Sequence, residues 1–321
     1  MPHAIDSNGS LGQQFSWNYE HVSKLWEFYG WIDNTTQLQA AAHYAGYSVL
    51  HDNSLRIITL NTDLYFKNNL YAYLRADDPD YSGMFTFLIQ ELQKAEDAGH
   101  RAWIIGHVPS GWDGQNALPN GSDLFYQIVD RYSPHVIANI FWGHTHEDQA
   151  TVYYAHNGTR QTADLAVAAA WIAPSMTPLR NMNAGYRVYE VDTGSWEVMD
   201  AWTMYADVAT FDSLAEAGTG PVFALEYSTR DAYGPAVDWP PDAPLNATFW
   251  HRVTEAMEAN RTLVSLFNSY QGKSSILSPN CTSDACAAAK VCYIRSGSTA
   301  LGRQCPQGFG GVQGPFTGKD F

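Results

Sequence analysis

The chain has 321 residues, of which 45% are hydrophobic and 14% aromatic, so it is long enough for about two domains and can bury a large core. Lys and Arg number 18 against 33 Asp and Glu, which gives a formal net charge of -15. A surface this acidic repels the phosphate backbone of nucleic acids and excludes a nucleic-acid-binding protein; it also disfavours an anionic lipid, whereas a zwitterionic headgroup is tolerated.

The first 142 residues predict an α/β arrangement in which helices alternate with buried strands. Because a strand, a helix and a second strand form one βαβ unit, the later strands should be parallel neighbours in one sheet. The isolated His21 and His43 in this region are interpreted as surface or packing residues. In chain order the pattern predicts helix 17–29, strand 47–50, strand 55–60, helix 82–98, strand 102–105, helix 124–132 and strand 136–142.

Two glycine-histidine sequences directly follow predicted strands: Gly106-His107, and Gly143-His144-Thr145-His146. Open α/β sheets place their active sites at the carboxyl ends of strands, so His107 and His144 should meet there. Residues two apart on an extended backbone point the same way, so His146 should join His144. Neutral imidazoles suit a borderline ion such as Zn²⁺. A His-x-His sequence alone is more often an accidental pair in a polar loop; the repeated strand-glycine-histidine context favours the metal site.

After His146 the pattern changes to successive strands, which predicts a second, largely antiparallel sheet. Near residue 210 the strand pattern is lost, and a Pro-rich link at 235–244 leads into helices. We therefore expect two domains, residues 1–210 and 211–321. The Gly-rich segment 306–321 is expected to be mobile. The predicted elements are strands 149–155, 165–173, 187–191 and 196–205, and helices 246–260, 261–270 and 285–291.

All four cysteines, Cys281, Cys286, Cys292 and Cys305, lie near the carboxyl end of the chain. Their spacing is not that of two Cys-x-x-Cys knuckles and no histidine lies among them, so disulfides are favoured over a zinc site. Sequence alone allows three pairings.

Seven asparagines lie in Asn-x-Ser/Thr sequences, the acceptor pattern for N-glycosylation. This density, together with the cysteines, predicts a glycoprotein of the secretory pathway that is secreted or resides in the lumen of a lysosome or vacuole. No apolar run approaches the roughly 18 residues of a membrane span, and no signal peptide opens the chain. The asparagines are Asn8, Asn34, Asn120, Asn157, Asn246, Asn260 and Asn280.

The two histidine motifs, Gly106-His107-Val108-Pro109 and Gly143-His144-Thr145-His146, resemble the last two metal motifs of calcineurin-like metallophosphoesterases. Their flanks are similar to those of acid sphingomyelinases and acid sphingomyelinase-like phosphodiesterases, and the similarity covers nearly the whole chain. The segments that carry it are 60–62, 104–111, 141–146, 173–175 and 183–189.

The resemblance implies the C-terminal portion of an α/β/β/α metallophosphoesterase sandwich in residues 1–210. It also implies a small disulfide-bonded helical domain in residues 211–321. In this family the C-terminal cysteines pair in sequence order, which here implies Cys281 with Cys286 and Cys292 with Cys305.

Enzymes of the family hold two zinc ions between seven side chains and hydrolyse a phosphodiester. By the resemblance, His107 and His144 correspond to ligands of one ion and His146 to a ligand of the other. Its Asp-x-His, Gly-Asp-x-x-Asp and Gly-Asn-His motifs, the last of which carries the histidine that protonates the leaving group, occur nowhere in the chain. We therefore assign no catalytic residue. We expect the C-terminal part of an enzyme, at most one weakly held zinc, and inactivity of this chain alone.

The loop at residues 174–185 is expected to return to the metal site and help to bind the headgroup. In the family an aromatic side chain of this loop contacts choline, and the corresponding position is Leu179, so either that contact has moved or the substrate differs. Tyr186 could supply an aromatic face instead, and Asn68 is a polar candidate for the wall of the substrate site.

Three functions are considered, of which the first is favoured for the parent protein and the third describes this chain as a remnant. The first is a zinc-dependent hydrolase that converts sphingomyelin to ceramide and phosphocholine, a monomer with transient contact to a membrane surface. The second is a phosphodiesterase of the same superfamily that acts on a nucleotide or another small ester. The third is a non-catalytic secreted glycoprotein.

Overall fold

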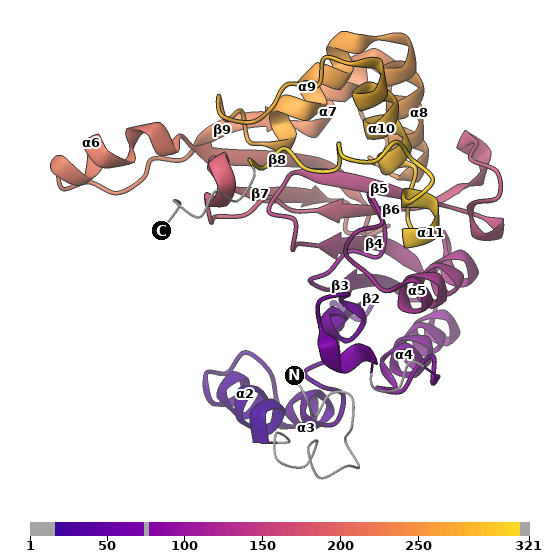
Figure 1. Cartoon of the computed structure of the whole chain (residues 1–321). Helices are drawn as coiled ribbons and strands as arrows, with labels where there is room; N and C mark the ends of the chain where they lie inside the picture. The colour runs from indigo at the N-terminus through magenta and orange to yellow at the C-terminus, as the bar shows by residue number, and fades with distance from the viewer. Residues whose placement is uncertain (1–16, 74–76, 315–321) are drawn as a thin grey trace.

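The computed structural model describes residues 17–73 and 77–314 and contains two β-sheets with helices on both sides (Figure 1). The first sheet has the strand order β1-β2-β3-β4-β6-β5, and the second has the order β7-β8-β9. In the first sheet the four inner strands are parallel, and β1 and β5 pair antiparallel at its two edges. The strands are β1 (Tyr47–His51), β2 (Leu55–Thr59), β3 (Arg101–Ile105), β4 (Ile137–Trp142), β5 (Gln149–Tyr154), β6 (Ala166–Ile172), β7 (Ala184–Val191), β8 (Val198–Ala206) and β9 (Ala224–Ser228).

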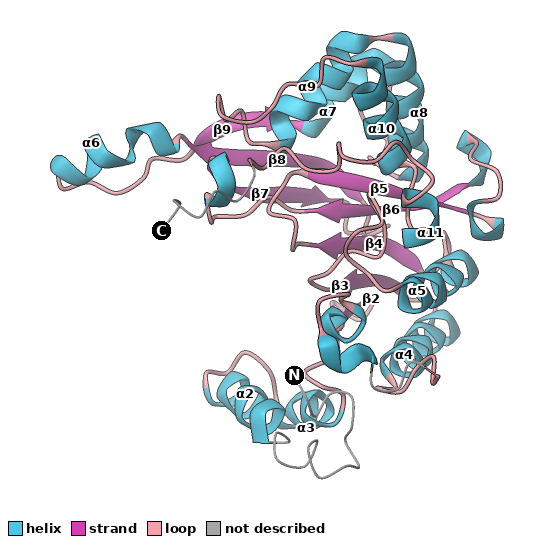
Figure 2. Ribbon diagram, viewed as in Figure 1, coloured by secondary structure: helices cyan, strands magenta, loops and turns pink. Residues whose placement is uncertain are grey.

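Helices α4 and α5 cover one face of the first sheet, whereas the outward residues Tyr186, Val188 and Glu190 of β7 in the second sheet are exposed; Figure 2 shows the helices and strands by colour. In Figure 1, α7 to α10 gather at one end of the molecule, and α2 and α3 lie at the other, where Gln39 of α3 accepts a hydrogen bond from the Ser48 N–H of β1. The α-helices in the described ranges are α2 (Trp17–Phe28), α3 (Asn34–Ala42), α4 (Met84–Ala98), α5 (Pro119–Tyr132), α6 (Phe211–Glu216), α7 (Thr229–Tyr233), α8 (Ala247–Ala259), α9 (Arg261–Gln271), α10 (Asp284–Ile294) and α11 (Thr299–Gly302).

Alternation along β4 shows how the layers stack. Trp142 packs against Phe125 of α5, with ring centroids 5.2 Å apart, whereas the preceding Phe141 packs against Tyr189 of β7 at 5.0 Å. Successive side chains of a strand point to opposite faces, so one face of the first sheet contacts helices and the other contacts the second sheet. On the face of the second sheet that carries Tyr189, Tyr227 of β9 stacks on Tyr270 of α9 at 3.9 Å. The expected fold, the C-terminal portion of an α/β/β/α sandwich with a disulfide-bonded helical region, is confirmed.

The helices after residue 245 share one continuous buried core with both sheets. Trp250 of α8 packs on Trp171 of β6 with ring centroids 5.4 Å apart, for example. Two disulfides staple this region, Cys281–Cys286 and Cys292–Cys305, which is the pairing that the family resemblance implied. The α10 helix carries Cys286 and Cys292, so both disulfides hold neighbouring segments to one helix.

Several sequence-based expectations need correction. Strands β5 and β6 belong to the first sheet rather than the second, because β6 pairs parallel with β4 and β5 pairs with β6. Helix α3 and strand β9 were not predicted at all, although β9 pairs with β8. The domain boundary expected after residue 210 therefore falls between two neighbouring strands of the second sheet.

The expectation that the Gly-rich segment 306–321 is mobile also needs correction for its described part. Residues 306–314 are held by hydrogen bonds to the body of the protein, among them a bond from the Trp112 indole Nε1 to the Gly310 carbonyl at 2.8 Å. Residues 315–321 of this segment lie outside the described residues.

Candidate metal centre

His107 and His144 lie side by side at the carboxyl ends of adjacent parallel strands. Ile105 of β3 pairs with Phe141 of β4, and the pairing continues into the loops, where the Gly143 N–H donates to the His107 carbonyl at 3.0 Å. The two imidazoles consequently face each other, with His144 Nδ1 3.3 Å from His107 Nε2. The topology predicted from the βαβ pattern brings this pair together.

The loop that carries His107 is fixed by a buried threonine. The Thr62 hydroxyl oxygen accepts the N–H groups of His107, at 2.9 Å, and Val108, at 2.6 Å. Gly106 leaves room for this arrangement, because a Cβ there would lie 2.4 Å from the Trp142 ring and 2.7 Å from the Thr62 methyl group. The glycine before the histidine is thus a requirement of close packing.

His144 and His146 both adopt a left-handed backbone, with φ of 72° and 65°. Non-glycine residues avoid this conformation, at a cost on the order of 1 kcal/mol each, and it is concentrated at functional sites. The alternation that predicted convergence of the two rings applies to extended backbone only. His144 turns toward His107 and packs edge-on against Phe66 with ring centroids 4.7 Å apart, while His146 lines the neighbouring cleft.

The separation of the paired histidines suits zinc. Two imidazole ligands of one tetrahedral zinc, with bonds of about 2.0–2.1 Å, have nitrogen atoms about 3.3 Å apart. Burial, and next the neighbouring His107, lower the pKa of His144 to about 4, so its ring remains neutral in mildly acidic water. Within residues 17–73 and 77–314, no group of three or more His, Cys, Asp or Glu side chains is arranged to hold a metal ion. Among the described residues, the facing pair His107 and His144 would supply two ligands of a zinc ion.

A cleft of about 520 Å³ opens beside the histidine pair. Two of the three expected substrate-binding residues, Asn68 and Leu179, line it. Tyr186 does not; it lies on β7 against Phe223, with ring centroids 5.2 Å apart. The lining residues are Phe66, Lys67, Asn68, Trp112, Asp113, Gln115, Asn116, His144, Thr145, His146, Glu147, Gln149, Leu179, Gly310, Gly311 and Gln313.

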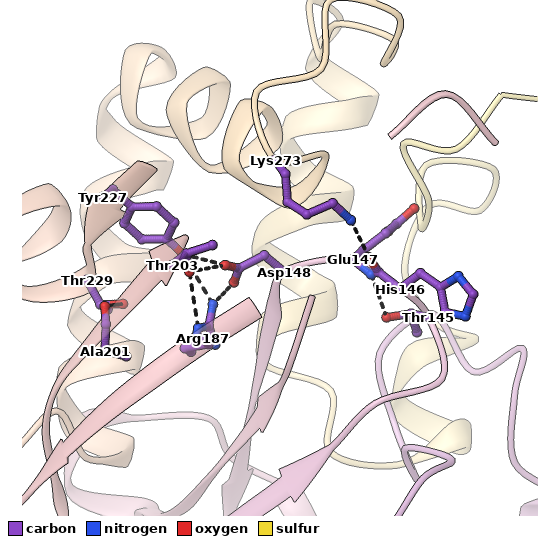
Figure 3. A network of polar contacts seen from close by, with 10 residues as sticks. All are labelled: Thr145, His146, Glu147, Asp148, Arg187, Ala201, Thr203, Tyr227, Thr229 and Lys273. Carbon is purple, nitrogen blue, oxygen red and sulfur yellow. Dashed lines mark hydrogen bonds and ion pairs between the residues drawn. The ribbon is translucent and has the colours of Figure 1, made fainter. Parts of the chain in front are cut away.

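Behind the cleft, buried charges hold the loop that follows His146 (Figure 3). Lys273, which follows α9 and is fully buried, donates from Nζ to the His146 carbonyl at 2.7 Å. Burial lowers the pKa of Lys273 to about 8. Its stem passes over Gly185, where a Cβ would lie 2.7 Å from the lysine Cδ. The helical region therefore fixes the backbone of a residue in the cleft.

Asp148 links the two sheets in the same figure. Its carboxylate forms an ion pair with Arg187 of β7 and accepts hydrogen bonds from Thr203 of β8 at 2.7 Å and Tyr227 of β9 at 2.9 Å. Asp148 directly precedes β5 of the first sheet, so one buried carboxylate contacts all three strands of the second sheet.

Sequence reasoning missed several residues of this region. Thr62 could have been suspected, since it follows a predicted strand as the histidine motifs do. Lys67, Lys273 and Gln313 gave no signal, because each reaches the site through contacts between segments that are distant in the sequence.

The expected glycosylation sites are mostly at the surface. Asn34, Asn120, Asn157, Asn260 and Asn280 are exposed, Asn246 is partly buried, and Asn8 lies outside the described residues. No helix in the described ranges combines the length and the apolar character that crossing a membrane would require.

Two stacked sheets with facing histidines at the ends of neighbouring parallel strands fit the C-terminal portion of a protein of the metallophosphoesterase class. No protein-family model matches the chain. Sphingomyelin phosphodiesterase 2 of Caenorhabditis elegans is 33% identical over 267 residues, which make up 82% of this chain and 39% of the relative. Sphingomyelin phosphodiesterase of Homo sapiens is 32% identical over 254 residues, 78% of this chain and 37% of the relative.

A third relative carries a different substrate in its name. The cyclic GMP-AMP phosphodiesterase SMPDL3A of Rattus norvegicus is 29% identical over 231 residues, 68% of this chain and 48% of the relative. The chain belongs to the family of sphingomyelin phosphodiesterases and acid sphingomyelinase-like phosphodiesterases. It spans less than half the length of each of these three relatives.

Proposed function

We propose that the chain is part of a zinc-dependent phosphodiesterase whose substrate is sphingomyelin, cleaved to ceramide and phosphocholine. The observation that carries the proposal is the 3.3 Å separation of His107 Nε2 and His144 Nδ1 at the mouth of the cleft, which fits two ligands of one tetrahedral zinc. The names of the relatives from Caenorhabditis elegans and Homo sapiens support the choice of substrate.

The chain's own residues would bind and orient the substrate. His107 and His144 would hold one zinc, and His146, in the adjoining cleft, would face a second. When bound, zinc supplies Lewis-acid polarisation of a phosphoryl oxygen. Lys67 and Asn68 line the cleft, where an ammonium and an amide can bind phosphate oxygens. A full ligand set and a proton donor for the leaving group require side chains beyond these, so we propose that this chain alone holds at most one zinc weakly and is inactive.

A second candidate is hydrolysis of a nucleotide phosphodiester. The relative named as a cyclic GMP-AMP phosphodiesterase favours it, as does the polar lining of the cleft, where amide side chains outnumber exposed aromatic rings. The disulfides and the exposed Asn-x-Ser/Thr sites support a secreted or lysosomal glycoprotein in either case.

The test uses the chain alone and a hybrid in which the part of the Caenorhabditis elegans relative that precedes the matched region is joined to this chain. Zinc is measured by elemental analysis, and hydrolysis of sphingomyelin and of cyclic GMP-AMP is measured at acidic pH. We expect at most one zinc and no turnover for the chain alone, and two zinc ions with sphingomyelin turnover for the hybrid. His144→Ala in the hybrid should abolish turnover.

A hybrid that cleaves cyclic GMP-AMP in preference to sphingomyelin would establish the second candidate. A folded hybrid that binds zinc and cleaves neither substrate would support the non-catalytic glycoprotein. Turnover by the short chain with two bound zinc ions would show that it carries ligands beyond the three histidines.

A further inference from the structure

The segment Gly310 to Gln313, far from the histidines in sequence, lies against the loop that carries them. The Gly310 carbonyl accepts hydrogen bonds from Trp112 Nε1 and Gln271 Nε2, both at 2.8 Å. The Val312 N–H donates to Glu147 Oε1 at 2.8 Å, and Gln313 Nε2 donates to the Thr145 carbonyl at 2.5 Å. Thr145 is the residue between His144 and His146, so the segment contacts the centre of the histidine turn.

The glycines at 310 and 311, and Gly314 directly after the segment, are closely packed against side chains. A Cβ at Gly310 would lie 2.2 Å from Asp113 Oδ2, and a Cβ at Gly314 would lie 2.1 Å from Asn181 Nδ2. At Gly311 a Cβ would lie 3.1 Å from Glu147 Oε1. Larger residues here would displace the side chains of Asp113, Glu147 and Asn181, so the glycine content fits close contact.

A buried chain of polar contacts anchors the segment to the helices. Glu147 is 1% exposed, and its second oxygen, Oε2, accepts from Gln271 at 2.6 Å and Gln149 at 2.8 Å. The side-chain oxygen Oε1 of Gln271 in turn accepts from Lys290 Nζ of α10 at 2.7 Å. Because these groups are almost completely buried, each needs its partner, and the arrangement is rigid. Glu147 thus links the segment to α9 and α10.

We propose that residues 310–313 form a fixed wall of the substrate cleft, that Gln313 contacts the substrate, and that Glu147 is the positioning residue that holds this wall. Gln313 lines the cleft and is partly exposed. One of its amide hydrogens is used on Thr145, which leaves the other hydrogen and the carbonyl oxygen for a phosphate or hydroxyl group. The proposal rests on the proposed function, because the ligand is the phosphate-bearing group of a phosphodiester substrate.

The experiment compares Gln313→Ala, Glu147→Leu and Glu147→Gln with Gln304→Ala as the matched control. Gln304 is exposed and lies in the same part of the chain, and it does not line the cleft. Three quantities are measured: the dissociation constants for phosphocholine and for a nucleoside monophosphate with the zinc-loaded chain, hydrogen exchange at the Val312 amide, and the melting temperature. In the active hybrid, KM and kcat are measured separately.

We expect Gln313→Ala to raise the dissociation constant and KM about tenfold, the loss typical of one hydrogen bond to a charged group, with kcat and the melting temperature unchanged. Glu147→Leu should remove the protection of the Val312 amide and weaken ligand binding. Glu147→Gln keeps an oxygen for the Val312 N–H but places an amide NH2 against the Gln271 and Gln149 donors, so it should restore both only in part. Gln304→Ala should behave as the unmodified chain. Comparison of the two ligands shows whether the wall favours a choline ester or a nucleotide.

Two results would contradict the proposal for residues 310–313 while leaving the proposed function intact. The first is unchanged ligand binding in Gln313→Ala, and the second is fast hydrogen exchange of the Val312 amide in an unmodified chain that binds ligand. If the unmodified chain and the hybrid bind neither ligand, the proposed function fails, and the substrate contact of Gln313 fails with it.

Discussion

His144 Nδ1 lies 3.3 Å from His107 Nε2, although the two residues belong to different strand-loop units of the sheet. Removal of either imidazole should therefore weaken zinc binding at least about tenfold, whereas His146→Ala should have a smaller effect on that ion. Equilibrium dialysis with Zn²⁺ measures this, with His21→Ala on the exposed surface of α2 as the control. Equal losses for all three variants would mean that His146 ligates the same ion.

Lys67 is the one Lys or Arg among the lining residues of the described cleft. Its backbone is fixed, because its N–H donates to the Asn116 carbonyl at 3.0 Å and its carbonyl accepts from the Tyr73 hydroxyl at 2.8 Å. Lys67→Met should weaken binding of phosphocholine roughly threefold to tenfold, most strongly at low salt. Titration calorimetry at two salt concentrations tests this, with exposed Lys24→Met as the control. Identical affinities at low salt would exclude a role for the ammonium group.

The Arg187–Asp148 ion pair is almost completely buried, with side chains 2% and 5% exposed. Arg187→Met would leave the Asp148 carboxylate buried without its counter-ion, which should lower the free energy of unfolding by about 3–5 kcal/mol. Urea denaturation measures the loss. Arg261→Met, which breaks the exposed ion pair with Asp284, is the matched control and should change little. Similar midpoints for the two variants would contradict the prediction.

Glu226 on β9 should make stability depend on pH. Burial raises its pKa to about 7, and its Oε1 accepts from the Ser274 hydroxyl at 2.7 Å. The unfolded chain loses this proton near pH 4.5 while the folded chain keeps it, so the contribution of Glu226 to stability is fully present below about pH 4.5 and is lost as the pH rises toward 7. Glu226→Gln should remove this dependence.

Melting temperatures between pH 4.5 and 7.5 provide the measurement. Relative to the unmodified chain, Glu226→Gln should gain stability as the pH rises. The control Glu190→Gln, at an exposed position of β7, should show the same change of melting temperature with pH as the unmodified chain. A constant difference between the Glu226→Gln and unmodified curves would show that the carboxyl group titrates alike in both states.

The histidine pair could be predicted because it depends on local pattern. A buried strand followed by Gly-His occurs twice, and two parallel strands in one βαβ unit place their ends together. The position of His146 could not be predicted, because His144 and His146 adopt a left-handed backbone conformation that a pattern of hydrophobic alternation does not reveal. Similarly, β6 was predicted as a strand, yet nothing in its alanine-rich sequence tells whether it pairs with β4 or with β7.

Long-range contacts account for the rest. Short β9 is recognisable only through its pairing with β8, and Lys273 follows a helix end with no feature that distinguishes it from a surface lysine. The glycines at 310, 311 and 314 were interpreted as mobile because glycine is equally typical of flexible tails and of close contacts. The structure distinguishes a flexible tail from a close contact, because the side chains of Asp113, Glu147 and Asn181 lie directly against these glycines.

The bond between Glu147 and Val312 spans 165 positions of the chain, and this has a consequence for biosynthesis. A ribosome produces the histidine turn long before Val312 and Gln313, so during translation the turn lacks the partners that hold Thr145 and Glu147 in place. The first sheet can assemble while the chain is still growing, but the cleft reaches its final form only after residue 313 has left the ribosome. The site is therefore completed later than the first sheet, after Cys292 and Cys305 have also been synthesised.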